Sequence, residues 1–155
     1  MKCTTCGKGL ERVDQEQIVT VGGRTFAGTA RGERCHDCGA TFLDGAEVEA
    51  FEEAAAYELA KDGPVSGETL RFLRTAGLGM RSGELARLLD VEPETLSRWE
   101  NGKIAMPRVP WATVAAMVIE RREGQHETLD RLRALAEPKL LAKAVRIERR
   151  VSARG

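Results

Sequence analysis

The pattern of hydrophobic and polar positions changes near residue 44. Before it, alternating runs over residues 17–21 and 24–27 flank Gly22-Gly23, which is the signal of a two-residue β-hairpin turn. After it, apolar residues over positions 45–62 recur at the spacing of one helix face. The chain is therefore predicted to begin with a small sheet and to continue as helices.

Helical periodicity resumes after Gly63-Pro64, which ends the first helix. Pro93 suits the first position of a helix, where its missing N–H costs nothing, and Asn101-Gly102 ends that helix. The pattern predicts further helices over residues 68–76, 82–89, 93–100, 110–122 and 128–137. An apolar stripe is predicted to be core, with a dimer seam as the alternative; it comprises Trp111, Val114, Met117 and Val118.

Four cysteines in the first part of the chain are candidate metal ligands. They form two Cys-x-x-Cys pairs, each followed by a glycine that permits a turn with positive φ. Two such turns can close a tetrahedral site of four thiolates, so we expect one structural zinc ion bound by Cys3, Cys6, Cys35 and Cys38. His36 is interpreted as a bystander, and two disulfides or a redox dithiol are the alternatives. The hairpin is too short to build its own core, so zinc binding, on the order of 10 kcal/mol, is expected to stabilise it.

Composition and charge narrow the class of protein. The chain has 155 residues, of which 42% are hydrophobic and 31% charged, which allows one or two small folded domains. No apolar run approaches a membrane span and no signal-peptide h-region is seen, so we expect a cytoplasmic protein with reduced cysteines. The net charge is zero, yet residues 1–60 carry −5 and residues 104–155 carry +5, which suggests two separate tasks.

The segment GELARLLDVEPETLSRWENGK, residues 83–103, predicts two short helices joined by a tight turn, the layout of a helix-turn-helix. Asp90 stands in that turn and tolerates a left-handed φ better than most residues, and Trp99 is expected to face the core. The segment resembles the XRE/Cro-repressor type of helix-turn-helix over about residues 68–136. The marks of the resemblance are Leu85-Ala86, Leu89, Val91, Leu96 and the run from Ser97 to Lys103.

The order of the motifs along the chain identifies a family more specifically than the cysteine pairs or the helix-turn-helix segment does alone. Cysteine pairs around a small insert, a linker helix and an XRE-type domain together resemble the MqsA (YgiT-type) antitoxin family. The resemblance implies an α+β fold, with a small zinc-stapled β domain followed by an all-α helix-turn-helix domain. The expected division is a zinc domain with linker helix over 1–62, a hinge over 63–67, the helix-turn-helix domain over 68–137 and a basic tail over 138–155.

The resemblance also implies a function. The family's zinc domain engages a toxin in the described members, and its second domain dimerises and binds operator DNA. We therefore expect a sequence-specific repressor that binds double-stranded DNA as a homodimer and holds a toxin protein. The alternative is a stand-alone XRE-type regulator with a structural zinc domain and no toxin. No enzyme is expected, because four thiolates leave zinc no open position and no nucleophile elbow is present.

Candidate DNA contacts come from matching this segment to the family. The resemblance places the early residues of the reading helix in the major groove, namely Pro93, Glu94, Thr95, Ser97 and Arg98. The family's base-contacting Arg matches Arg98, which is expected to read guanine O6 and N7. The family's Asn is replaced by Glu94, which can only accept a hydrogen bond, as from cytosine N4. Positioning contacts to phosphate are expected from Ser82, Asn101 and Lys103.

Two further sets of charged residues receive an interpretation. Glu92 and Glu100 are expected to favour the helix start or to face solvent. After Pro138, basic residues recur at the spacing of one helix face, which suggests phosphate contacts; they are Lys139, Lys143, Arg146 and Arg150. A frayed terminus is the alternative.

Overall fold

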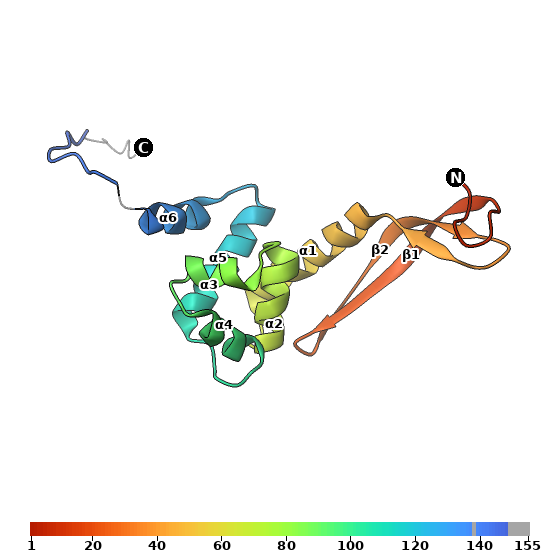
Figure 1. Ribbon diagram of the computed structural model, residues 1–155, viewed down its shortest axis with the longest axis horizontal. Helices are drawn as coiled ribbons and strands as arrows, with labels where there is room; N and C mark the ends of the chain where they lie inside the picture. The colour runs from red at the N-terminus through yellow and green to blue at the C-terminus, as the bar shows by residue number, and fades with distance from the viewer. Residues whose placement is uncertain (138, 149–155) are drawn as a thin grey trace, which may run out of the picture.

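The computed structural model describes residues 1–137 and 139–148. A three-stranded antiparallel sheet in the order β1-β2-β3 comes first and the helices follow, so the fold class is α+β. The molecule is elongated, with the cysteine loops and the N-terminus at one end and most of the helices at the other (Figure 1).

The sheet is dominated by one long hairpin. Strands β1 (Leu10–Val21) and β2 (Arg24–Cys35) pair in register along twelve residues each, and β3 (Thr41–Leu43) adds a short strand to β2. Gly22 and Gly23 form the turn with φ of 59° and 76°, the conformation that suits a two-residue hairpin. The predicted hairpin is confirmed, but its strands extend well beyond residues 17–27. Polar residues such as Gln15 and Gln17 hold half-buried positions there, so hydrophobic alternation does not reveal the full length.

Helix α1 (Gly45–Asp62) links the sheet to the helices. Asp44 caps its start by accepting a hydrogen bond from the Ala46 N–H at 3.0 Å. Near its start it packs on β2, where Phe51 fills the space beside Gly28: a Cβ at that glycine would lie 2.8 Å from the Phe51 ring. Its second half is buried among the other helices through Ala55, Ala56, Leu59 and Ala60.

The remaining helices follow in quick succession. They are α2 (Gly67–Phe72), a π-helical turn η1 (Leu73–Gly77), α3 (Ser82–Leu88), α4 (Pro93–Glu100), α5 (Arg108–Arg122) and α6 (Glu127–Ala136). The helix predicted over 68–76 is thus formed in two pieces, because its second half widens into the π-helical turn, where the Leu78 N–H donates to the Leu73 carbonyl five residues earlier. Within residues 1–137 and 139–148, no helix combines the length and apolar character needed to cross a membrane.

The helices surround a core that also takes in the hairpin tip. The predicted stripe on α5 is core, since Val114, Met117 and Val118 are buried and Trp111 packs against them. Val21, the last residue of β1, is only 5% exposed and belongs to the same cluster. The division of the chain at a hinge over 63–67 stays a prediction, and Arg24 of β2 donates a hydrogen bond to the Gly63 carbonyl of this segment.

The described part of the basic tail forms no helix, which agrees with the alternative of a frayed terminus. Residues 139–148 form no regular structure and lie exposed, so the helical face predicted for Lys139, Lys143 and Arg146 is not formed, while Arg150 lies outside the described residues. Apolar side chains such as Leu140 and Ile147 are 105% and 84% exposed. Because a short helix without a packing partner is marginal in water, sequence periodicity alone does not form it.

Candidate metal centre and nucleic-acid interface

The cysteines lie at the open end of the hairpin, one pair in the loop before β1 and the other at the end of β2. The two turns are built alike. The Gly7 N–H donates to the Cys3 carbonyl at 2.8 Å, and the Gly39 N–H donates to the Cys35 carbonyl at 2.9 Å. Both glycines have positive φ, 76° and 73°, as predicted. The same local geometry therefore presents each pair of thiols.

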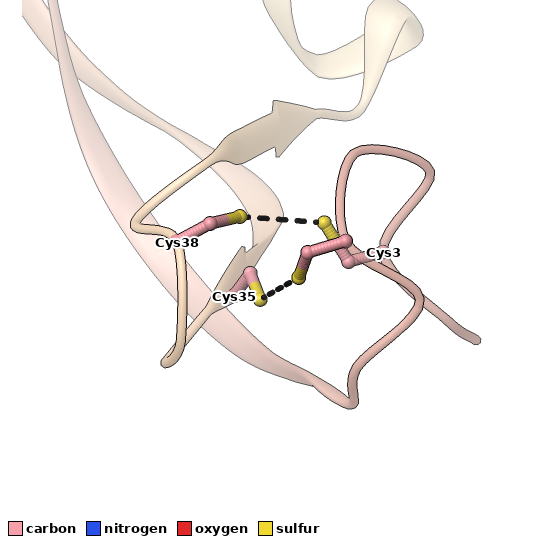
Figure 2. Close-up of side chains that lie close together, drawn as sticks. Cys3, Cys35 and Cys38 are labelled. Atoms are coloured by element: carbon pink, nitrogen blue, oxygen red, sulfur yellow. Dashed lines mark hydrogen bonds between the residues drawn. The ribbon is translucent and has the colours of Figure 1, made fainter.

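The sulfur atoms converge on one space (Figure 2). The Sγ atoms of Cys3 and Cys38 lie 3.6 Å apart, and those of Cys6 and Cys35 lie 3.4 Å apart. All four lie within 4.8 Å of one another, and none is in a disulfide. A tetrahedral ion with sulfur ligands at about 2.3 Å requires sulfur–sulfur edges of about 3.8 Å. The group can therefore hold one metal ion without rearrangement of its turns.

Crowding gives these thiols opposed protonation preferences. Burial would raise the pKa of the Cys3 thiol, but backbone N–H groups of its own turn and the neighbouring thiols lower it to about 6. The Lys8 N–H lowers the pKa of Cys6, but the facing Cys35 thiol and burial together raise it to about 12. A thiolate next to a thiolate is unfavourable in the absence of a cation. The positive charge of a divalent ion offsets this repulsion, so coordinated thiols are held as thiolates.

His36 takes no part in this group. Its Nε2 atom lies 2.8 Å from the Glu11 carboxylate, and both side chains are largely exposed. Over the described chain, the cluster suited to a metal consists of the four cysteines.

The second candidate site is the surface of α4. Helices α3 and α4 are joined by a turn in which Asp90 has a φ of 53°, so the predicted left-handed residue is confirmed. The Val91 N–H donates to the Ala86 carbonyl at 3.0 Å and closes the turn. Leu85 and Ala86 of α3 and Leu96 of α4 are buried together, which fixes the two helices against the core.

Helix α4 has a buried face and an exposed face. Leu96 and Trp99 point into the core, and Trp99 is 5% exposed, as predicted. Glu94, Ser97 and Arg98 lie exposed, at the spacing of one helix face. Three of the five side chains predicted to meet bases are therefore brought together on one accessible surface.

Glu94 and Arg98 contact each other on that surface. The Arg98 Nη2 atom donates to Glu94 Oε1 at 2.7 Å, with the two side chains 55% and 75% exposed. An exposed pair of this spacing contributes only about 0.3–0.5 kcal/mol. The contact orders the two side chains but does not prevent either from making another hydrogen bond.

The predicted positioning residues differ in how they are held. The Asn101 amide donates to the Ser97 carbonyl at 2.8 Å, and its oxygen accepts from Arg71 at 2.9 Å, so this side chain is engaged at both ends. Ser82 is the first residue of α3 and is half-buried. Lys103 is exposed just beyond α4. Pro93 and Thr95 lie in the first turn of α4, Pro93 exposed and Thr95 half-buried.

Glu100 does not face solvent, which corrects its interpretation from sequence. Its side chain is 5% exposed, and its oxygens accept from Arg74 Nε at 2.6 Å and Nη2 at 3.0 Å. Arg74 also donates to the Met80 carbonyl at 3.0 Å. Glu100 lies four residues after the buried Leu96, and this spacing was the available signal of an inward position.

Comparisons with protein-family models, curated proteins and solved structures give no match for this chain.

Proposed function

We propose that the chain is a sequence-specific DNA-binding transcriptional repressor of the XRE helix-turn-helix type, with a zinc-stabilised N-terminal region that binds a protein partner. The observation that carries the proposal is the two-sided α4, whose inner face is anchored by Trp99 while its outer face presents Glu94 and Arg98. A short helix of this kind, set by a preceding helix and a tight turn, is the element that repressors insert into the major groove.

Arg98 is the proposed reader of guanine and Glu94 the proposed acceptor from cytosine N4. A good base contact discriminates by about 1–3 kcal/mol, which exceeds the few tenths lost if the exposed Glu94–Arg98 contact is rearranged. Ser82 and Lys103 are the proposed phosphate contacts. Asn101 is proposed to have a mainly structural role, because its amide group is already hydrogen-bonded to Ser97 and Arg71. One reading helix covers few base pairs, so binding as a homodimer to two half-sites is part of the proposal.

The test is selection of bound DNA from a random pool with the unmodified chain and with Arg98→Ala. We expect the variant to lose guanine preference at one position of each half-site. Arg122→Ala, which removes an exposed arginine at the end of α5, is the matched control. It should select the same DNA sequence as the unmodified chain. Equal affinity of the unmodified chain for selected and random DNA across salt concentrations would contradict the proposal.

The metal is proposed to be zinc, because a tetrahedral set of four thiolates suits this ion. With all four positions taken, the ion has no open site for a substrate, which favours a structural role without catalysis. Elemental analysis of the purified chain should give one zinc per chain. Cys35→Ser should lower this content sharply, whereas His36→Ala should leave it unchanged. Iron in place of zinc, with the colour of a cluster, would contradict the assignment.

A groove of about 700 Å³ on the sheet supports the proposed partner-binding role. Its lining includes the apolar residues Val13, Phe42 and Leu43 and charged residues such as Arg12 and Glu33. Co-expression with the product of an adjacent gene, followed by size-exclusion chromatography, tests the antitoxin reading. Leu43→Glu should abolish co-elution, while Ile18→Glu, at an exposed residue of β1 outside the groove, should not. Failure of the unmodified chain to co-elute would favour the stand-alone regulator.

A further inference from the structure

The two strands β1 and β2 form a long ribbon, with the cysteines at its open end and the Gly22-Gly23 turn at its tip. The tip packs against the helices, an arrangement called here the seat of the tip (Figure 1). The Gly22 N–H donates to Glu68 Oε2 in the first turn of α2 at 3.0 Å. Arg24 Nη1 donates to the Gly63 carbonyl at 3.0 Å. Val21, beside the turn, is buried in the core of the helices. The tip of the hairpin is therefore held by hydrogen bonds and by apolar burial.

The space around Gly22 is too small for a side chain. A Cβ at Gly22 would lie 2.6 Å from Thr69 Oγ1 and 2.9 Å from a ring carbon of Pro64. Both distances are shorter than van der Waals contact, so the backbone of the turn lies directly on the start of α2. This fit distinguishes a specific seat from a loose surface contact.

The start of α2 in turn lies against the end of α4. A Cβ at Gly67 would lie 2.4 Å from the Trp99 carbonyl oxygen and 2.5 Å from that of Glu100. A continuous path of packed groups therefore leads from the hairpin tip, through the first turn of α2, to the C-terminal end of α4.

The ribbon depends on what holds its two ends. Strands of twelve residues span on the order of 35–40 Å, and a two-stranded hairpin is marginally stable in water by itself. The cysteine group closes the open end, the helices hold the tip, and α1 covers part of one face. Loss of the attachment at one end, either the cysteine group or the packing on the helices, therefore weakens the ribbon and the attachment at its other end.

We infer that metal binding at the cysteines and the stability of the helices are one linked equilibrium, transmitted through the seated hairpin tip. Metal stabilises the ribbon, the ribbon keeps Val21 in the core, and the seated turn steadies α2 against α4. Linkage is reciprocal, so loosening the tip must also weaken metal binding. The inference rests on the proposed metal centre but not on DNA binding.

The chain carries a natural probe for this linkage. Both of its tryptophans, Trp99 and Trp111, lie in the helices and none in the sheet, so their fluorescence reports the helices alone. The experiment compares thermal unfolding of the full chain, zinc-loaded and after chelation, by tryptophan fluorescence. Zinc content and thiol reactivity are measured on the same samples. We expect chelation to lower the tryptophan midpoint by about 5 °C or more.

Variants at the tip separate linkage from general destabilisation. Arg24→Ala should shrink the shift caused by chelation and speed the release of zinc to a competing chelator several-fold, and Arg24→Lys should restore part of both. Arg122→Ala, at an exposed arginine at the end of α5, away from both the tip and the cysteines, should keep the unmodified shift.

Three results would overturn the inference. One is an unchanged tryptophan midpoint after chelation, in samples whose thiols have become reactive. Another is a chelation shift in Arg24→Ala equal to that of Arg122→Ala. A chain that binds no zinc when loaded removes the metal centre itself and the linkage with it, and zinc analysis tells this case apart from the other two.

Discussion

The buried ion pair between Arg74 and Glu100 allows a quantitative prediction. Arg74 lies in η1 and Glu100 ends α4, so the pair joins two helical segments through residues that are 26 positions apart in the chain. The perturbation is Glu100→Met, which leaves the guanidinium in the interior without its carboxylate. Removing one partner of a buried ion pair costs about 3–5 kcal/mol. The Arg74 side chain is 11% exposed and keeps its bond to the Met80 carbonyl, so we expect the lower end, about 3 kcal/mol.

The assay is chemical and thermal unfolding followed by tryptophan fluorescence, which is sensitive here because Trp99 precedes Glu100. For a chain of this length, about 3 kcal/mol corresponds to a fall in Tm of about 10 °C. The double variant Arg74→Met with Glu100→Met should recover most of the loss, since an apolar pair of similar volume avoids the cost of an unpaired charge. Equal losses in the single and double variants, or a loss below about 1 kcal/mol for Glu100→Met, would refute the reasoning.

Three further predictions concern single positions. Gly67→Ala should destabilise the chain by about 2 kcal/mol or more through its clash with the Trp99 carbonyl, whereas Gly83→Ala, which meets nothing within 4 Å, should stabilise it slightly; unfolding in urea compares the two. Asp90→Gly should raise the free energy of unfolding by about 0.5–1 kcal/mol by relieving its left-handed φ, and a decrease would show that the aspartate side chain contributes to the turn. Glu94→Gln should strengthen binding to random DNA and weaken any preference for cytosine about fivefold or more, measured by fluorescence anisotropy; an equal gain on selected and random DNA would contradict base reading by Glu94.

Local patterns predicted the parts of the molecule that depend on neighbours in sequence. The start and end of α4 follow from Pro93 and Asn101-Gly102, and the cysteine group follows from two turns of standard geometry. The left-handed Asp90 was also predictable, because few residue types tolerate that conformation.

Features that depend on distant partners were not predictable in this way. The spacing of Glu100 from Leu96 indicates an inward position, but its partner Arg74 lies on another helical segment, and no rule of periodicity connects the two. The seat of the hairpin tip brings Gly22 to Glu68, which are 46 residues apart. The full length of β1 was also not predictable from hydrophobic alternation, because its half-buried face contains glutamines where an ordinary strand has aliphatic residues. Side-chain contacts of exposed residues, such as Glu94 with Arg98, follow from helix spacing, but the base that each would read does not.

The burial of α1 bears on how such a chain can be divided or recombined. A cut at the segment 63–67 would separate the motifs as they appear in sequence, yet it would leave the helices after it without Ala56 and Leu59, which are 0% exposed in the intact chain. A fragment that begins after the cut would expose the apolar surface that these residues cover, and it would also lack Val21 of the same core cluster. The smallest portable unit that keeps α4 in its native setting therefore begins no later than the start of α1, so an exchange of N-terminal regions between related chains must carry this helix along with the helices that it supports.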